Sequence, residues 1–185
     1  MKANPKSIVR IRSTALEIRK ILGIKPMENI NIIRLLEMVI CPVFNLKLEI
    51  IEKCMMTDKY AEYNPIEKVI RIREDVYENA VNGIGRDRFT ISHEIGHIFL
   101  HSDNIVMARS NEKFPIYCDP EWQANTFARE FLCPINGILN SDDIETIANR
   151  YGVSKEVARI QLSQKNKTTG RQFYLRLPKT SLASI

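Results

Sequence analysis

The chain has 185 residues, a length that can bury a core as one domain or as one domain with a small appendage. Hydrophobic residues make up 44% and charged residues 26%, which fits a folded soluble protein and excludes a wholly disordered one. No apolar run approaches the ~18 residues that span a bilayer, and no secretory signal is recognisable. The four cysteines are scattered, without a C-x-x-C pair, so we expect a cytoplasmic protein with no membrane partner.

The net charge of +5 is unevenly distributed along the chain. Residues 1–25 carry seven Lys/Arg and one acid, residues 150–185 carry eight and one, and the middle is acidic. Basic ends of this kind fit two hypotheses: contact with a polyanion, or charge that keeps exposed helices soluble.

The hydrophobic pattern predicts an α+β fold that is mainly helical around a small antiparallel sheet. Helical apolar spacing begins at Ile8 and again at Glu28, and strand-like alternation follows in residues 43–50 and 69–73. A further strand is predicted near residues 59–63, and helices are predicted at 86–101, from 119, from 141 and from 154, followed by a short strand at 171–178. If residues 69–73 form a sheet edge beside a cleft, they could bind a substrate as an added strand, although Arg71 and Arg73 could equally discourage such pairing.

The most informative motif is His93-Glu94-Ile95-Gly96-His97 in the helix predicted at 86–101. Two histidines four residues apart share one helix face, and two imidazoles there can bind one Zn²⁺. Glu94 is placed to act as the general base on a water molecule at the metal, and Gly96 leaves room for a neighbour to approach. Paired histidines can also be ordinary packing residues, but two of only three histidines fall in this pattern with Glu in the required position.

A catalytic zinc needs a third protein ligand and an open position for water. His101 lies on the same helix and is difficult to bring around the metal, so we interpret it as a residue that suits the helix C-terminus. Cys118 is a second candidate, in an irregular stretch. Glu121 is the preferred candidate, because Asp119-Pro120 predicts a helix start there and Asn125 follows one turn later to support a ligating histidine. The alternative for Glu121 is an acid in the first turn of a helix.

The segment 144–158 has the spacing of a helix-turn-helix motif, with Ala148, Gly152 in the turn and Ser154 before the second helix. Lys155 and Arg159 make that helix basic, so DNA binding through a major groove is one hypothesis. The same turn packs helices in many proteins, and Glu156, Val157 and Ala158 are not an obvious set for contacting bases. A structural module or one that docks a repressor is the favoured alternative.

Three blocks of sequence closely resemble the ImmA/IrrE family of zinc metallopeptidases. These are RFTISHEIGHIFLH at 88–101, EWQANTFA at 121–128 and LCP at 132–134, where Cys133 stands at a position often held by Met. The resemblance implies a gluzincin-like site with His93, His97 and Glu121 on one zinc and Glu94 as general base. It leaves the oxyanion-stabilising residue open, with Tyr63 and Tyr117 as candidates.

The resemblance also implies a function and a domain organisation. We expect a zincin-like metallopeptidase domain at residues 1–136 and a small helix-turn-helix-like module at 137–185. The expected function is zinc-dependent, site-specific cleavage of a partner helix-turn-helix repressor, which switches on mobile-element or stress genes. The alternatives are a DNA-binding regulator that uses the C-terminal module, and a non-catalytic protein that binds a repressor.

Overall fold

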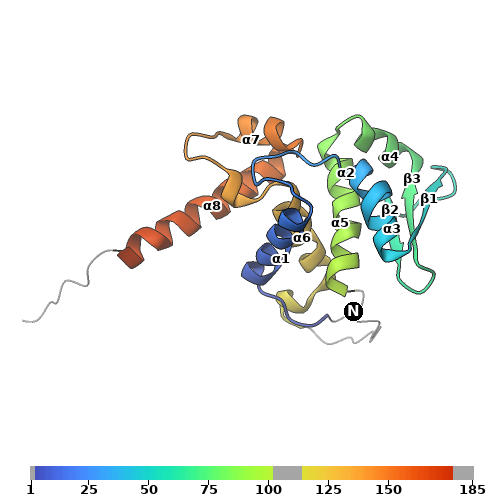
Figure 1. The fold of residues 1–185 in the computed structure, drawn as a ribbon, viewed down its shortest axis with the longest axis horizontal. Coiled ribbons are helices and arrows are strands. Elements are labelled where there is room, and N and C mark those ends of the chain that lie inside the picture. Colours follow the sequence, from blue (N-terminus) through green and yellow to red (C-terminus); the bar gives the residue numbers. More distant parts are fainter. Residues whose placement is uncertain (1–2, 102–113, 177–185) are drawn as a thin grey trace, which may run out of the picture.

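The structure is a computed structural model that describes residues 3–101 and 114–176, with side chains as far as residue 169 (Figure 1). Helices dominate, and the described residues also form one three-stranded sheet, so the predicted α+β class is confirmed. The helices are α1 (Ile8–Ile21), α2 (Ile32–Leu35), the π-helical turn η1 (Leu36–Ile40), α3 (Cys41–Phe44), α4 (Glu74–Val81), α5 (Gly85–His101), the 3₁₀ turn η2 (Ile116–Cys118), α6 (Pro120–Leu132), the 3₁₀ turn η3 (Ile135–Gly137), α7 (Ile144–Tyr151) and α8 (Lys155–Arg176). The strands are β1 (Lys47–Ile51), β2 (Ala61–Asn64) and β3 (Val69–Arg73).

The sheet is mixed, and the prediction of an antiparallel sheet was correct only for one of its two strand pairs. The strand order is β1-β3-β2, with β3 parallel to β1 and antiparallel to β2. After β1, the polypeptide begins β2 at the end of the sheet where β1 stops. A tight turn after β2 then places β3 between β1 and β2. Because β2 supplies the return, the parallel pair β1 and β3 needs no helical crossover of its own.

The edge of the sheet beside α5 is β2, so the condition under which residues 69–73 could bind a substrate as an edge strand is not met. Both sides of β3 are taken by neighbouring strands, and four of its five residues are buried. The alternating apolar pattern of 69–73 therefore reflects a central strand. The separate prediction of a strand at 171–178 was wrong for residues 171–176, because α8 continues as a helix to Arg176. Residues 177 and 178 lie outside the part of the chain that the structure describes.

Helix α5 runs through the middle of the molecule, with α6 and α1 on one side and the sheet with α2 and α3 on the other (Figure 1). Its apolar face includes Ile91, Ile95 and Ile98, each with no exposed surface. These residues lie in one core cluster with Phe127 and Phe131 of α6. This burial fixes which face of α5 remains for polar side chains, and His93 and His97 lie there only partly buried.

The turn between α7 and α8 is attached to α5 by the buried side chain of Arg88. Its Nη1 donates to the carbonyls of Tyr151 (3.1 Å) and Gly152 (2.6 Å), and its Nη2 donates to Ile30 O (2.6 Å) and Asn29 Oδ1 (2.5 Å). The apolar core continues into this region, since Ile147 and Tyr151 of α7 belong to the same cluster as α5. In the part of the chain that the structure describes, no helix is long and apolar enough to cross a membrane.

Candidate metal centre

Two imidazoles of α5 face the same space. The Nε2 atoms of His93 and His97 lie 2.9 Å apart, as their four-residue spacing on one helix face predicts. The other ring nitrogen of each histidine is held: Nδ1 of His93 lies 3.0 Å from Asn125 Oδ1, and Nδ1 of His97 lies 3.0 Å from Nδ1 of His101. Both Nε2 atoms are therefore oriented toward one point.

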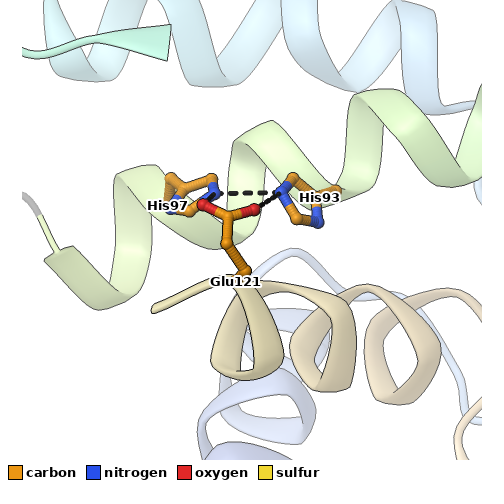
Figure 2. Close-up of side chains that lie close together, drawn as sticks. All are labelled: His93, His97 and Glu121. Carbon is orange, nitrogen blue, oxygen red and sulfur yellow. Dashed lines mark hydrogen bonds and ion pairs between the residues drawn. The ribbon is translucent and has the colours of Figure 1, made fainter. Parts of the chain in front are cut away.

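The carboxylate of Glu121 comes to the same point from the start of α6 (Figure 2). As predicted, Asp119 is the N-cap of this helix, and its side chain accepts a hydrogen bond of 2.9 Å from the backbone N–H of Glu121. Glu121 Oε2 lies 3.2 Å from His93 Nε2, and Oε1 lies 3.5 Å from His97 Nε2. The three candidate ligand atoms lie within 4.8 Å of one another.

The donor set fits a zinc ion by geometry and by chemistry. Two ligand atoms at 2.0–2.1 Å from a tetrahedral zinc are separated by about 3.3 Å. The two Nε2 atoms lie 2.9 Å apart, and each has one of the two Glu121 oxygens within 3.5 Å, so these separations are close to that value. Two imidazole nitrogens and one carboxylate oxygen are ligands that zinc prefers, and three protein ligands leave a fourth position for water. The imidazoles of His93 and His97, which lie within hydrogen-bonding distance of the Glu121 carboxyl, hold its pKa well below the ordinary value, so it stays charged as a ligand must.

Glu94 lies beside this group but is held by the sheet. Its Oε2 accepts a hydrogen bond of 2.8 Å from the backbone N–H of Tyr63 in β2, and only 9% of the residue is exposed. Burial raises the pKa of the Glu94 carboxyl, which makes the carboxylate a better proton acceptor. This arrangement suits a general base rather than a ligand.

His101 has a closer relation to the site than its sequence position indicated. It contacts His97 and, through Nε2, Gln123 Oε1 at 3.0 Å, so our interpretation of a simple helix-terminal residue missed these side-chain contacts. Burial lowers the pKa of His101 to about 4. The only sequence signal was its spacing, four residues after His97.

The remaining candidates lie elsewhere in the structure. Cys118 is buried at the end of η2 and is not part of the ligand group found among the described residues. Tyr117 is 47% exposed, and its carbonyl accepts hydrogen bonds from Lys6 N and Gln123 Nε2. Burial raises the pKa of the Tyr63 hydroxyl. A role for either tyrosine in stabilising an oxyanion stays a prediction.

Comparison with known proteins gives one match. The family model of the IrrE N-terminal-like domain, peptidase family M78, matches residues 48–163. This range contains the sheet except for Lys47, the first residue of β1, together with α4 to α7, the start of α8 and all of the candidate site. No curated protein and no solved structure matches the chain significantly. On this match, which spans more than half of its length, the chain belongs to the IrrE N-terminal-like family of M78 peptidases.

Proposed function

We propose that the protein is a zinc-dependent endopeptidase. The observation that carries the proposal is the meeting of His93 and His97 with Glu121, from a different helix, at distances that suit one tetrahedral metal ion. A zinc ion bound there supplies a Lewis acid that polarises a scissile carbonyl and acidifies water. The family match supports a metallopeptidase-type function independently of this geometry.

The chain's own residues provide the remaining parts of the reaction. Glu94 accepts a proton from the attacking water and delivers it to the leaving amine, a role that its raised pKa favours. Its hydrogen bond to Tyr63 N fixes the carboxylate beside the sheet edge.

The outer edge of β2 provides a place for the substrate backbone. Glu62 pairs with Arg71 inside the sheet, whereas the N–H of Tyr63 points away from β3 toward Glu94. By the alternation of a strand, the backbone groups of Ala61 share that outer edge. An extended substrate segment can add there as a further strand, next to the metal site.

The proposed substrate is a partner helix-turn-helix repressor, whose cleavage would switch on mobile-element or stress genes. Its support is the resemblance of the motif blocks to the ImmA/IrrE family. An extended segment is what an edge strand binds, so the cleaved bond should lie in a linker or an opened part of the repressor rather than in an intact helix.

The test is co-expression with candidate helix-turn-helix repressors, beginning with any that is encoded next to the gene for this protein, followed by mass mapping of the fragments. We expect one major cleavage that disappears with Glu94→Gln and with chelation of the metal. Full-length repressor in the presence of the zinc-loaded wild-type protein, over a range of concentrations, would contradict the peptidase function. Repressor that remains intact but co-purifies with the protein would instead support the non-catalytic binder.

The DNA-binding alternative receives less support from the contacts around α8. Lys155 forms an ion pair of 2.5 Å with Glu145, and Arg159 forms one of 2.5 Å with Glu156. Carboxylates beside both cations weaken the attraction of this helix to phosphates. Duplex affinity that depends steeply on salt and falls on charge reversal at Lys155 and Arg159, but survives removal of the metal, would restore this alternative.

A further inference from the structure

A chain of hydrogen-bonded side chains leads away from the metal site behind His97. The Nδ1 atom of His97 lies 3.0 Å from Nδ1 of His101, and Nε2 of His101 lies 3.0 Å from Oε1 of Gln123. The Nε2 amide of Gln123 donates to two backbone carbonyls, Asn4 O at 2.8 Å and Tyr117 O at 2.7 Å. The chain thus ends on two groups that can only accept hydrogen bonds.

The two carbonyls determine where the protons lie in this series of hydrogen bonds from Gln123 to His97. Because carbonyl oxygens accept hydrogen bonds and never donate them, the amide nitrogen of Gln123 must face them and its oxygen must face His101. That oxygen requires a proton on Nε2 of His101, which leaves Nδ1 of a neutral His101 as an acceptor. His97 must then carry its own proton on Nδ1, so the lone pair of its Nε2 points toward Glu121 and the metal position.

We propose that His101 and Gln123 are positioning residues that lock His97 in the metal-binding tautomer and orientation. For His93, Asn125 supplies a single acceptor to Nδ1. For His97, the acceptor is a second histidine whose tautomer is fixed by Gln123. The inference rests on the proposed zinc site, in which His97 is a ligand.

The burial of these residues supports a positioning role. Gln123 has no exposed surface and lies two residues after Glu121 on α6, so one helix supplies both a ligand and the support of another ligand. The carbonyl of Asn4 belongs to an N-terminal segment that pairs with η2 through Ala3 N to Cys118 O (2.8 Å) and Lys6 N to Tyr117 O (3.0 Å). A buried amide with all three partners in place resists rotation, and so does the histidine that it holds.

The first experiment needs no variant. Long-range ¹H–¹⁵N spectra of the histidine rings, recorded on the wild-type protein with and without zinc, assign the tautomer of each ring. We expect His101 to carry its proton on Nε2 in both forms and His97 to carry its proton on Nδ1. A neutral His101 with its proton on Nδ1 would overturn the proposed positioning of His97 by His101 and Gln123.

The second experiment compares two substitutions of His101 by zinc affinity, measured by competition with a chromophoric chelator, and by the visible absorption of the Co²⁺-substituted protein. His101→Asn keeps an acceptor oxygen near the position of Nδ1, whereas His101→Leu keeps bulk and removes the acceptor. We expect His101→Leu to weaken zinc binding about 10-fold to 100-fold and to change the Co²⁺ spectrum, and His101→Asn to recover most of the affinity. Thr90→Val on the same helix is the control, with wild-type affinity expected.

Failure of the inference and failure of the proposed function give different results. Wild-type zinc affinity in both His101 variants, or equal losses in both, would overturn the positioning role of His101 and Gln123. Neither result would contradict the zinc site itself. A wild-type protein that binds no zinc would overturn the proposed function. The tautomer of His101 in the metal-free protein would still test whether His101 and Gln123 position His97. If His101→Leu does not fold, the tautomer assignment and His101→Asn carry the test.

Discussion

The backbone N–H of Tyr63 donates a hydrogen bond of 2.8 Å to Glu94, and so joins the edge strand of the sheet to the helix that carries the histidines. The two residues are 31 positions apart in the chain. Through this bond, the strand that we propose as the place for the substrate also fixes the carboxylate that we propose as the general base. The bond therefore gives Glu94 a structural role in addition to its proposed chemical one.

Two substitutions of Glu94 should separate these roles. Glu94→Gln keeps an acceptor for Tyr63 N but cannot take a proton, so we expect cleavage to fall about 10²-fold to 10⁴-fold with little change in thermal stability. Glu94→Ala leaves the N–H of Tyr63 without its partner, so we expect a loss of stability of about 1–3 kcal/mol in addition to the loss of cleavage. Thermal unfolding and a quantitative cleavage assay measure both effects. Equal stability of the two variants would show that the bond contributes nothing to the fold.

The carboxylate of Glu121 should be needed for tight metal binding. Glu121→Gln keeps the shape of the side chain but removes its charge, so we expect zinc affinity to fall at least about tenfold, as measured by chelator competition. Glu145→Gln, at an exposed acid of α7, is the matched control and should bind zinc as the wild type does. Unchanged affinity in Glu121→Gln would remove this residue from the ligand set.

Gly96 sets the distance between the two helices that build the site. A Cβ atom there would lie 3.1 Å from Phe127 Cδ1 and 3.2 Å from both Cα and O of Ala124 in α6. A branched side chain must push α6, which carries Glu121, away from α5. For Gly96→Val we expect a loss of about 2 kcal/mol, a melting temperature lower by roughly 4–8 °C, and weaker zinc binding. Thr90→Val is the control, and a Gly96→Val protein with wild-type stability and zinc affinity would contradict this account.

Arg88 should hold the α7–α8 turn through the planar shape of its guanidinium group as well as its charge. Its two terminal nitrogens donate to four oxygen acceptors, and Lys offers a single ammonium that cannot reach them all. We expect Arg88→Lys to lower stability by about 2 kcal/mol and to speed hydrogen exchange in α7 and the start of α8. Arg86→Lys, at an exposed position two residues earlier, should leave exchange in α7 unchanged. Similar exchange in both variants would contradict the proposed role.

The pH dependence of stability should contain a contribution from Asp142. Arg150 donates two hydrogen bonds to this buried carboxylate, at 2.5 and 2.7 Å, and Leu139 N donates a third at 2.7 Å; the side-chain bonds of Arg150 are the main reason that its pKa lies below the ordinary value. A carboxyl with a lowered pKa in the folded state stabilises the protein fully above the unfolded pKa of about 3.9, and this contribution is lost as the pH falls toward the folded pKa.

We therefore expect Asp142→Asn to melt below the wild type at pH 7, with a difference that shrinks as the pH falls below about 4. Melting curves between pH 7 and pH 3 measure this difference. Asp58→Asn, at an exposed aspartate, is the control and should show little difference at any pH. A constant difference for Asp142→Asn across this range would mean that the charge of Asp142 is not the cause.

Sequence patterns correctly predicted the features that depend only on residues close together in the chain. The spacing of His93 and His97 puts them on one helix face whatever surrounds the helix, and Asp119 with Pro120 starts α6 through contacts within one turn. The same helical period places Asn125 one turn after Glu121 on α6. Helical geometry fixes these relations within each helix, so the amino-acid sequence alone determined them, whereas the 3.0 Å contact between Asn125 Oδ1 and Nδ1 of His93 also depends on the packing of α6 against α5.

The tertiary structure decided what depends on long-range pairing. Alternation in residues 69–73 identifies a strand but carries no information on its neighbours, and only the folded sheet shows that β3 is central and β2 is the edge. The support of His97 by His101 and Gln123 likewise requires α5, α6 and the N-terminal segment to meet. Hydrogen-bond partners that are 22 or 119 residues apart in the chain are set by how helices pack, and no local spacing specifies them.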